Sequence, residues 1–140
     1  MSEAHGPMSE TALESLRYTK THEWVRIDGG SATVGITDHA QQEISDVVFV
    51  ELPKVGRVVR QGEEVAVVES VKAAFSIYAP VSGTVALVNE TLAKDPSLTN
   101  RAPFGDGWIF RLQPVNAQEA QALFSRADYQ AWVTGEGKGH

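Results

Sequence analysis

The chain contains no cysteine among its 140 residues. This absence excludes disulfide scaffolds, thiol catalysis and cysteine-ligated zinc, while a domain of this length can bury a core without cross-links. Apolar runs long enough to cross a bilayer are also lacking. The sequence therefore predicts a globular protein without a membrane partner.

Basic residues are few. Twelve lysines and arginines stand against 18 acidic residues, for a net charge of −6, and the basic residues are scattered. Nucleic-acid binding needs clustered positive charge, so no nucleic-acid partner is predicted. Residues 1–14 hold no lysine or arginine, which argues against a secretory signal or a transit peptide. We expect a monomer in the bacterial cytoplasm, or in the mitochondrial matrix if the chain is a processed eukaryotic form.

Residues typical of enzyme sites are sparse. His5 and His140 lie near the ends of the chain, which leaves His22 and His39 as two isolated histidines. A metal site needs three or four converging ligands, so none is predicted. Motifs of nucleophile elbows, phosphate loops and dinucleotide sites are absent. No catalytic residue is predicted, and the chain is not expected to be an enzyme.

Between residues 18 and 113 the hydrophobic pattern has a period of two, which is typical of β-strands. Asp28-Gly29-Gly30 is a hairpin signal, and Thr37 or Asp38 can cap a short helix over residues 39–44. The nearly continuous apolar run 47–52 predicts a buried strand. Many short strands at close spacing indicate a mainly β fold, a sandwich or a barrel. Further strands are expected at 24–27, 32–36, 64–68, 75–78, 84–88 and 108–112.

The period changes near the end of the chain. Asn116 and Glu119 have the spacing of a capping box, and an apolar helical face follows. Ser125 can divide this region into two helices, the second over residues 126–133. We predict three segments: a flexible N-terminal segment 1–15, a single domain 16–134 and a flexible tail 135–140.

Lys72 lies between two strand-like runs, where a hairpin tip is expected. A lysine at such a tip is usually only a solvated charge. However, the runs 62–69 and 75–88 form two similar strand-turn units that meet at this lysine. A lysine presented at the junction of two quasi-equivalent sheets is one that a modifying enzyme can reach.

Around Lys72 the chain reads Glu69-Ser70-Val71-Lys72-Ala73-Ala74, followed by Ile77-Tyr78-Ala79-Pro80-Val81-Ser82-Gly83. These residues resemble the lipoylation signature of glycine cleavage H-proteins. Further stretches match the family in the same order, so that the resemblance covers residues 18–129. They are His22-Glu23-Trp24-Val25, Val34-Gly35-Ile36-Thr37-Asp38-His39-Ala40-Gln41, Val47-Val48-Phe49-Val50-Glu51-Leu52-Pro53, Val88-Asn89-Glu90 and Gly107-Trp108.

The resemblance implies a barrel-sandwich hybrid, as in lipoyl and biotinyl domains. Two small antiparallel sheets are expected, with a short helix after the first hairpin and helices at the C-terminal end. The resemblance also implies lipoic acid in amide linkage to Lys72. The residues expected to form the recognition context of that lysine are Glu69, Ser70, Val71, Ala73 and Gly83.

The implied role is that of a lipoyl carrier. It would take the aminomethyl group of glycine from a PLP-dependent glycine decarboxylase to a tetrahydrofolate-dependent aminomethyltransferase, and pass electrons to dihydrolipoamide dehydrogenase. A lipoate-attaching enzyme is a further implied partner. Two alternatives remain: an H-like lipoylated protein that relays lipoate outside glycine cleavage, and an unmodified β-domain used for binding.

In the family the loaded arm is thought to fold into a surface cleft, and the corresponding residues here are Thr21, Glu23 and Ser76. Glu23 could hold the aminomethyl ammonium through a charge-assisted hydrogen bond. After Ala73 and Ala74 the family usually has Ser-Asp, whereas this chain has Phe75-Ser76. The missing carboxylate at position 76 predicts a weaker hold on the arm, and the change Ser76→Asp is expected to strengthen it.

Overall fold

The computed structural model describes residues 10–136, and over this range the fold is mainly β. The strands are β1 (Arg17–Tyr18), β2 (Glu23–Asp28), β3 (Ser31–Ile36), β4 (Val47–Glu51), β5 (Val58–Val59), β6 (Glu64–Ser70), β7 (Ala74–Tyr78), β8 (Gly83–Val88) and β9 (Phe110–Leu112). The helices are α1 (Glu10–Glu14), α2 (Asp38–Ile44), α3 (Thr91–Lys94), α4 (Leu98–Arg101), α5 (Ala117–Gln121) and α6 (Arg126–Glu136).

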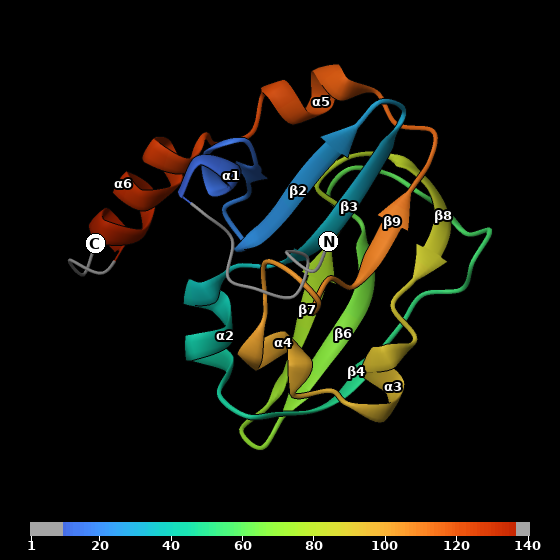
Figure 1. Cartoon of the computed structure of the whole chain (residues 1–140), viewed down its shortest axis with the longest axis vertical. Helices are drawn as coiled ribbons and strands as arrows, with labels where there is room; N and C mark the ends of the chain where they lie inside the picture. Colours follow the sequence, from blue (N-terminus) through green and yellow to red (C-terminus); the bar gives the residue numbers. More distant parts are fainter. Residues whose placement is uncertain (1–9, 137–140) are drawn as a thin grey trace.

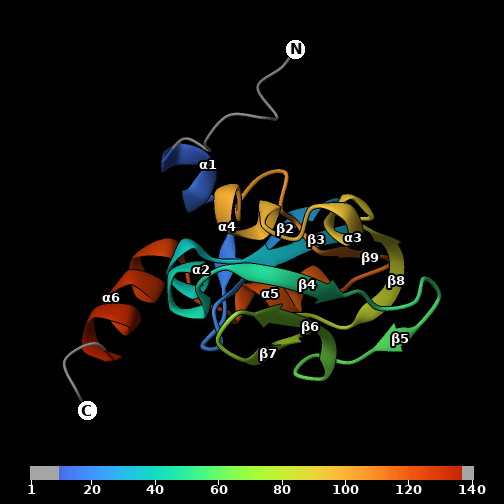
Figure 2. The same cartoon turned by 90° about the horizontal axis from the view of Figure 1, so that it is seen from below.

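The strands form two antiparallel sheets. The larger sheet has the order β1-β2-β3-β9-β8-β5, and the smaller has the order β4-β6-β7. The smaller sheet lies over the larger one as a second layer (Figure 2). This arrangement confirms the predicted barrel-sandwich fold class. None of the helices within residues 10–136 is both long and apolar enough to span a bilayer.

The first hairpin and the helix after it form where the sequence predicts them. Strands β2 and β3 pair from Glu23 opposite Ile36 to Asp28 opposite Ser31. Gly29 takes a positive φ of 59° in the turn, which glycine adopts without steric cost. Thr37 caps α2, since its hydroxyl accepts a hydrogen bond from the backbone N–H of Ala40.

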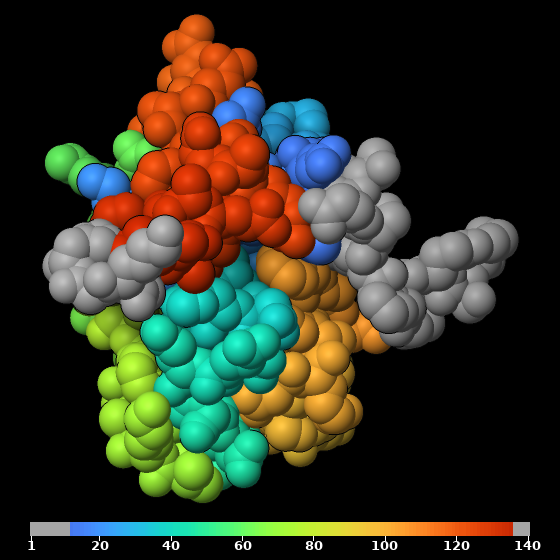
Figure 3. Space-filling view, turned by 90° about the vertical axis from the view of Figure 1, so that its left-hand side faces the viewer, coloured from blue at the N-terminus to red at the C-terminus, as the bar shows by residue number. Residues whose placement is uncertain are grey.

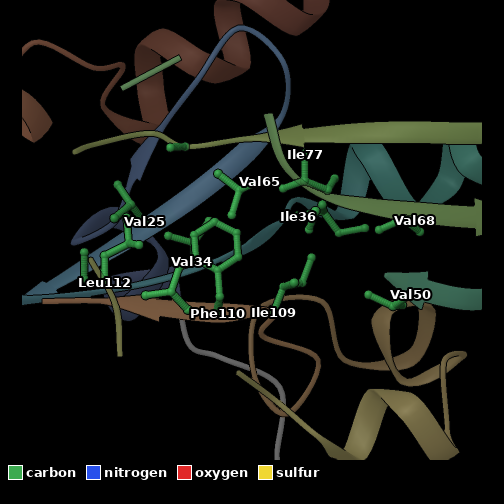
Figure 4. Packing of buried hydrophobic residues seen from close by; sticks show 14 of the residues in the cluster. Val25, Val34, Ile36, Val50, Val65, Val68, Ile77, Ile109, Phe110 and Leu112 are labelled. Carbon is green, nitrogen blue, oxygen red and sulfur yellow. The ribbon is translucent and has the colours of Figure 1, made fainter. Parts of the chain in front are cut away.

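The main core fills the space between the two sheets. Aliphatic side chains of both layers and the ring of Phe110 meet there (Figure 4). Burial of this apolar surface supplies the main driving force of folding. A second, smaller cluster joins β1, β2 and α6, and consists of Leu16, Tyr18, Trp24 and Tyr129.

The prediction of a buried strand over residues 47–52 is wrong for half of that strand. Val48 is 54% exposed and Phe49 is 48% exposed. The reason is that β4 lies at the edge of the smaller sheet and pairs only with β6. A shift of register between Val47 and Phe49 accompanies this exposure.

The C-terminal region forms the two predicted helices, α5 and α6, with Ser125 between them. Asn116 caps α5 as expected, because its side chain accepts from the N–H of Gln118. The carboxylate of Glu119 instead accepts from the backbone N–H and the hydroxyl of Ser82. Residues 10–14 are helical. The flexibility predicted for residues 1–9 and 137–140 concerns positions outside the described range, and the domain boundaries remain predictions.

Candidate functional site

Lys72 lies at the tip of the hairpin that joins β6 to β7. Val67 pairs with Ser76, Val68 with Phe75 and Glu69 with Ala74, so the chain reverses over residues 71–73. The tip lies at the end of the smaller sheet, at the lower edge of the molecule in Figure 1. The side chain of Lys72 is exposed. The structure therefore confirms the predicted position of this lysine.

The side chain of Ser70 organises this turn. Its hydroxyl oxygen accepts hydrogen bonds from the N–H groups of Lys72 (3.0 Å) and Ala73 (3.2 Å). The backbone N–H of Ser70 donates to the carbonyl of Ala73 at 2.8 Å. Serine hydroxyls commonly hold turns in this way. Ser70 thus defines the backbone on which Lys72 is presented.

The tip is also attached to its surroundings. The N–H of Val71 donates to the carbonyl of Asp46 at 3.0 Å, just before β4. The Nζ of Lys72 donates to the carbonyl of Glu43, on α2, at 2.9 Å. In the space-filling view α2 (teal) lies beside the hairpin (light green) and below α6 (red) (Figure 3). The amine of Lys72 is therefore both accessible and directed toward α2.

The structure separates one residue of the predicted recognition context from the others. Glu69, Ser70, Val71 and Ala73 all lie at the hairpin, and Val71 is 69% exposed. Gly83 begins β8 in the larger sheet. A Cβ there would lie 2.9 Å from the carbonyl oxygen of Pro114, so close packing explains this glycine.

The prediction that Lys72 lies between two equivalent sheets is wrong. Its two flanking strands, β6 and β7, pair with each other within the smaller sheet. The similar runs 62–69 and 75–88 do not correspond to a symmetry of the two layers, because β8 pairs with β5 and β9 in the larger sheet.

A small cleft of about 80 Å³ lies between α2, β7 and the turn before β2. Thr21 and Ser76, two of the three residues predicted for the arm cleft, line it. Glu43 also lines it, and its carbonyl accepts from the amine of Lys72. Lys72 and the cleft are therefore neighbours. The remaining lining residues are His22, Ile36, Ala40, Ile44, Phe75 and Ile77.

Glu23, the third predicted residue, is fully buried. One carboxylate oxygen accepts from the hydroxyls of Thr19 and Thr21, and the other accepts from the backbone N–H of Tyr78 at 3.0 Å. Glu23 thus joins β2 of the larger sheet to β7 of the smaller one. Burial raises the pKa of the Glu23 carboxyl above its ordinary value of 4.5, against the opposing effect of these hydrogen bonds.

Replacing Glu23 with glutamine is expected to change how stability depends on pH. Because the pKa of Glu23 is raised in the folded state, its contribution to stability is complete below about pH 4.5 and is lost as the pH rises through the folded value. Glutamine cannot ionise, so Glu23→Gln removes this component. Urea unfolding of both proteins from pH 4 to pH 7 measures the difference, and parallel curves would contradict the assignment.

Two polar groups of the cleft were not singled out from the sequence as parts of it. Glu43 and His22 line it together with the predicted Thr21 and Ser76. A helical spacing places Glu43 four positions after His39 on one face of α2, but nothing local relates that face to a hairpin 29 residues away.

The hydroxyl of Ser76 donates to the carboxylate of Glu64 at 2.9 Å, which brings a negative charge to this strand.

The site fits an amide-linked prosthetic group. The amine of Lys72 is a primary amine on an exposed turn, which is a suitable target for acylation. Its present partner is a backbone carbonyl, and an amide nitrogen retains one N–H that can donate to such an acceptor. Acylation therefore leaves no buried group without a partner at this position.

Comparison with known proteins gives a consistent result. The sequence model of the family described as glycine cleavage H-protein matches residues 16–136. The glycine cleavage system H protein of Thermus thermophilus is 54% identical over 119 residues, which are 85% of this chain and 93% of that protein. The protein of the same name from Halorhodospira halophila is 53% identical over 125 residues, or 89% and 96% of the two chains.

A solved structure is also similar. The crystal structure of a glycine cleavage system H protein from Mycobacterium marinum superposes with a TM-score of 0.76 at 34% sequence identity. The match covers 89% of this chain and 98% of that one. The structural similarity therefore extends over most of the chain, and the residues matched by the family model include Lys72.

Proposed function

Because this chain belongs to the glycine cleavage H-protein family, we propose that lipoate in amide linkage to Lys72 is the group through which it works. The family supplies the lipoyl carrier of the glycine cleavage system, and this chain is such a carrier subunit and not itself a catalyst. The position of Lys72 on an exposed turn held by Ser70 supports the assignment of the attachment site most strongly.

The lipoyl group, when attached, supplies a dithiolane that can be reduced and can hold the aminomethyl group of glycine. The residues of this chain supply its position. Ser70 holds the turn, and the carbonyl of Glu43 accepts from the lysine nitrogen. Fixing one end of a flexible arm in this way raises the local concentration of its reactive end at each partner.

The proposed partners follow from the chemistry of that circuit. They are a PLP-dependent glycine decarboxylase, a tetrahydrofolate-dependent aminomethyltransferase, dihydrolipoamide dehydrogenase and a lipoate-attaching enzyme. The proposed compartment is the bacterial cytoplasm, because the similar proteins named above come from bacteria. We further propose that the carrier acts as a monomer.

The proposed parking place of the arm is the cleft between α2 and β7. Thr21 and Ser76 line it, and both present hydroxyl groups that can donate or accept hydrogen bonds. Glu23 is a positioning residue in this proposal, because it is buried and binds the hydroxyl of Thr21. Glu23 acts on the cleft through Thr21 and not by direct contact.

The change Ser76→Asp is expected to slow the hydrolytic loss of the aminomethyl group from the loaded protein. A carboxylate at the cleft attracts the positively charged end of the arm, whereas Ser76 now only donates to Glu64. The rate of loss from purified loaded protein measures the effect. Ser76→Asn is the matched control without the charge, and equal rates in the wild type and Ser76→Asp would remove Ser76 from the proposal.

The attachment site is tested by the intact mass of the protein after expression with lipoate and a lipoate-attaching enzyme. An increment of one lipoyl group is expected, and peptide mapping should place it on the peptide that contains Lys72. An unmodified chain, or a lipoyl group on another lysine, would overturn the assignment.

A further inference from the structure

The fold brings together three side chains that can bind a metal ion. His22, His39 and Glu43, here called the His22 cluster, each offer one ligand atom, and these atoms all lie within 4.8 Å of one another. Nε2 of His39 lies 3.2 Å from a carboxylate oxygen of Glu43, and the two imidazole rings have centroids 4.7 Å apart. The expectation that the two histidines are isolated is therefore wrong.

The backbone holds the two parts of the cluster in place. His39 and Glu43 lie four positions apart on α2, which places both side chains on one face of the helix. His22 lies in the turn before β2, and its carbonyl accepts from the N–H of Thr37, the cap of α2, at 3.0 Å. The turn and the start of the helix are thus bound to each other by a main-chain hydrogen bond.

The backbone of His22 is also unusual. Its φ is 73°, in the left-handed region that side-chain-bearing residues adopt at a cost in energy. The N–H of His22 donates to the carbonyl of Thr19 at 3.1 Å, which closes the turn. The turn directs the imidazole of His22 toward that of His39. Residues with such strained backbone conformations are often found in binding sites.

A hydrogen-bonded partner orients the ring of His22. Its Nδ1 lies 2.8 Å from the hydroxyl of Tyr129, and that hydroxyl lies 2.7 Å from the hydroxyl of Thr37. Tyr129 belongs to α6 and is itself buried. Histidines that bind metals are commonly held by such a contact at one ring nitrogen, while the other nitrogen binds the ion. With Nδ1 directed at Tyr129, Nε2 is the nitrogen through which His22 would bind an ion.

We propose that the His22 cluster binds one zinc ion or a similar late first-row divalent cation. Two imidazole nitrogens and one carboxylate oxygen form a typical zinc ligand set. The side chain of His39 is 28% exposed and that of Glu43 is 60% exposed, so an ion can enter from solvent. Three protein ligands leave a fourth position for water or for an external ligand.

The test is a calorimetric titration of the full-length chain with Zn²⁺ at pH 7. The chain should be unlipoylated, because a reduced lipoyl group has thiols that bind zinc themselves. Because the chain carries no lipoyl group in this experiment, the result does not depend on whether Lys72 is the attachment site. One Zn²⁺ per chain is expected. The variants Glu43→Gln and His39→Gln should each weaken Zn²⁺ binding by about tenfold or more. Even the mutation of residues that only hydrogen-bond to metal ligands typically lowers metal affinity by that much.

Two control variants separate the cluster from other ligands. Glu51→Gln removes an exposed carboxylate on β4, and the double change His5→Ala with His140→Ala removes the remaining histidines of the chain. Both should bind Zn²⁺ as the wild type does. Failure of the wild type to bind, equal affinity in Glu43→Gln and His39→Gln, or loss of binding in the His5/His140 variant would each overturn the proposal.

A second measurement identifies the ligand atoms directly. The ¹⁵N shifts of the imidazole nitrogens of His22 and His39 should change on addition of one equivalent of Zn²⁺, with the larger change at Nε2 of each ring. Glu43 is exposed, so Glu43→Gln should remain folded and keep this measurement informative. Unchanged imidazole shifts at saturating Zn²⁺ would contradict the assigned ligands.

Discussion

Replacing Lys72 with arginine is expected to abolish the carrier activity of the protein and to leave its fold intact. Arginine keeps the positive charge, but its guanidinium stays protonated at neutral pH and cannot be acylated as an amine can. Glycine decarboxylation in a reconstituted system should therefore fall to the level measured without this chain. The Lys72→Arg protein should also gain no lipoyl mass.

The fold should survive because little depends on the lysine side chain. Lys72 is exposed, and its Nζ donates to one backbone carbonyl, that of Glu43. Exposed substitutions of this kind usually change stability by less than about 0.5 kcal/mol. Denaturant unfolding should give the same midpoint for both proteins, so that a loss of activity cannot be attributed to unfolding.

Lys54→Arg is the matched control for this experiment. Lys54 is also exposed, between β4 and β5, and its replacement should leave lipoylation and decarboxylation unchanged. Full activity of Lys72→Arg would refute the assignment of the attachment site. A wild-type chain that is lipoylated but does not stimulate decarboxylation would instead leave the site intact and contradict the proposed partners.

Replacing Gly35 with alanine is expected to destabilise the fold by about 3 kcal/mol, near the upper end of the usual cost of overpacking. Gly35 on β3 lies opposite Trp24 on β2. A Cβ at Gly35 would lie 2.7 Å from Cε2 and Cζ2 of the indole ring. Carbon atoms do not approach so closely, so either the ring or the strand must move.

The ring of Trp24 has little freedom to move. It is 1% exposed and packs in the second cluster with Tyr18 and Tyr129. Its Nε1 donates to the carbonyl of Pro103 at 2.8 Å, and any shift of the ring weakens this buried hydrogen bond. The cost of the alanine is therefore expected to be large, and urea unfolding at neutral pH should measure it.

Two comparisons test the stated cause. Gly30→Ala adds a Cβ that meets no atom within 4 Å, so its effect on the free energy of unfolding should be small. In a Trp24→Ala background, Gly35→Ala should be neutral or slightly stabilising, because the clash is gone and alanine suits a strand better than glycine. A loss of about 3 kcal/mol in that background as well would rule out the contact with the ring.

The local features of this protein follow from its sequence. The hairpin at Gly29, the helix capped by Thr37 and the turn that carries Lys72 all lie where the sequence predicts them. Each depends on neighbouring residues: a glycine that tolerates positive φ, a hydroxyl that caps a helix, and an alternation of apolar side chains. The resemblance to the family signature is what led to Lys72 as the proposed attachment site.

How these local features meet depends on contacts between segments that are distant in the sequence. The carboxylate of Glu23 reaches Tyr78, 55 positions away, and Glu119 reaches Ser82 instead of completing a capping box. Alternation of side chains tells which residues share a face, but it does not tell which strand lies at an edge or which layer covers that face. For this reason the exposure of Phe49 and the His22 cluster appear only when distant segments pack together.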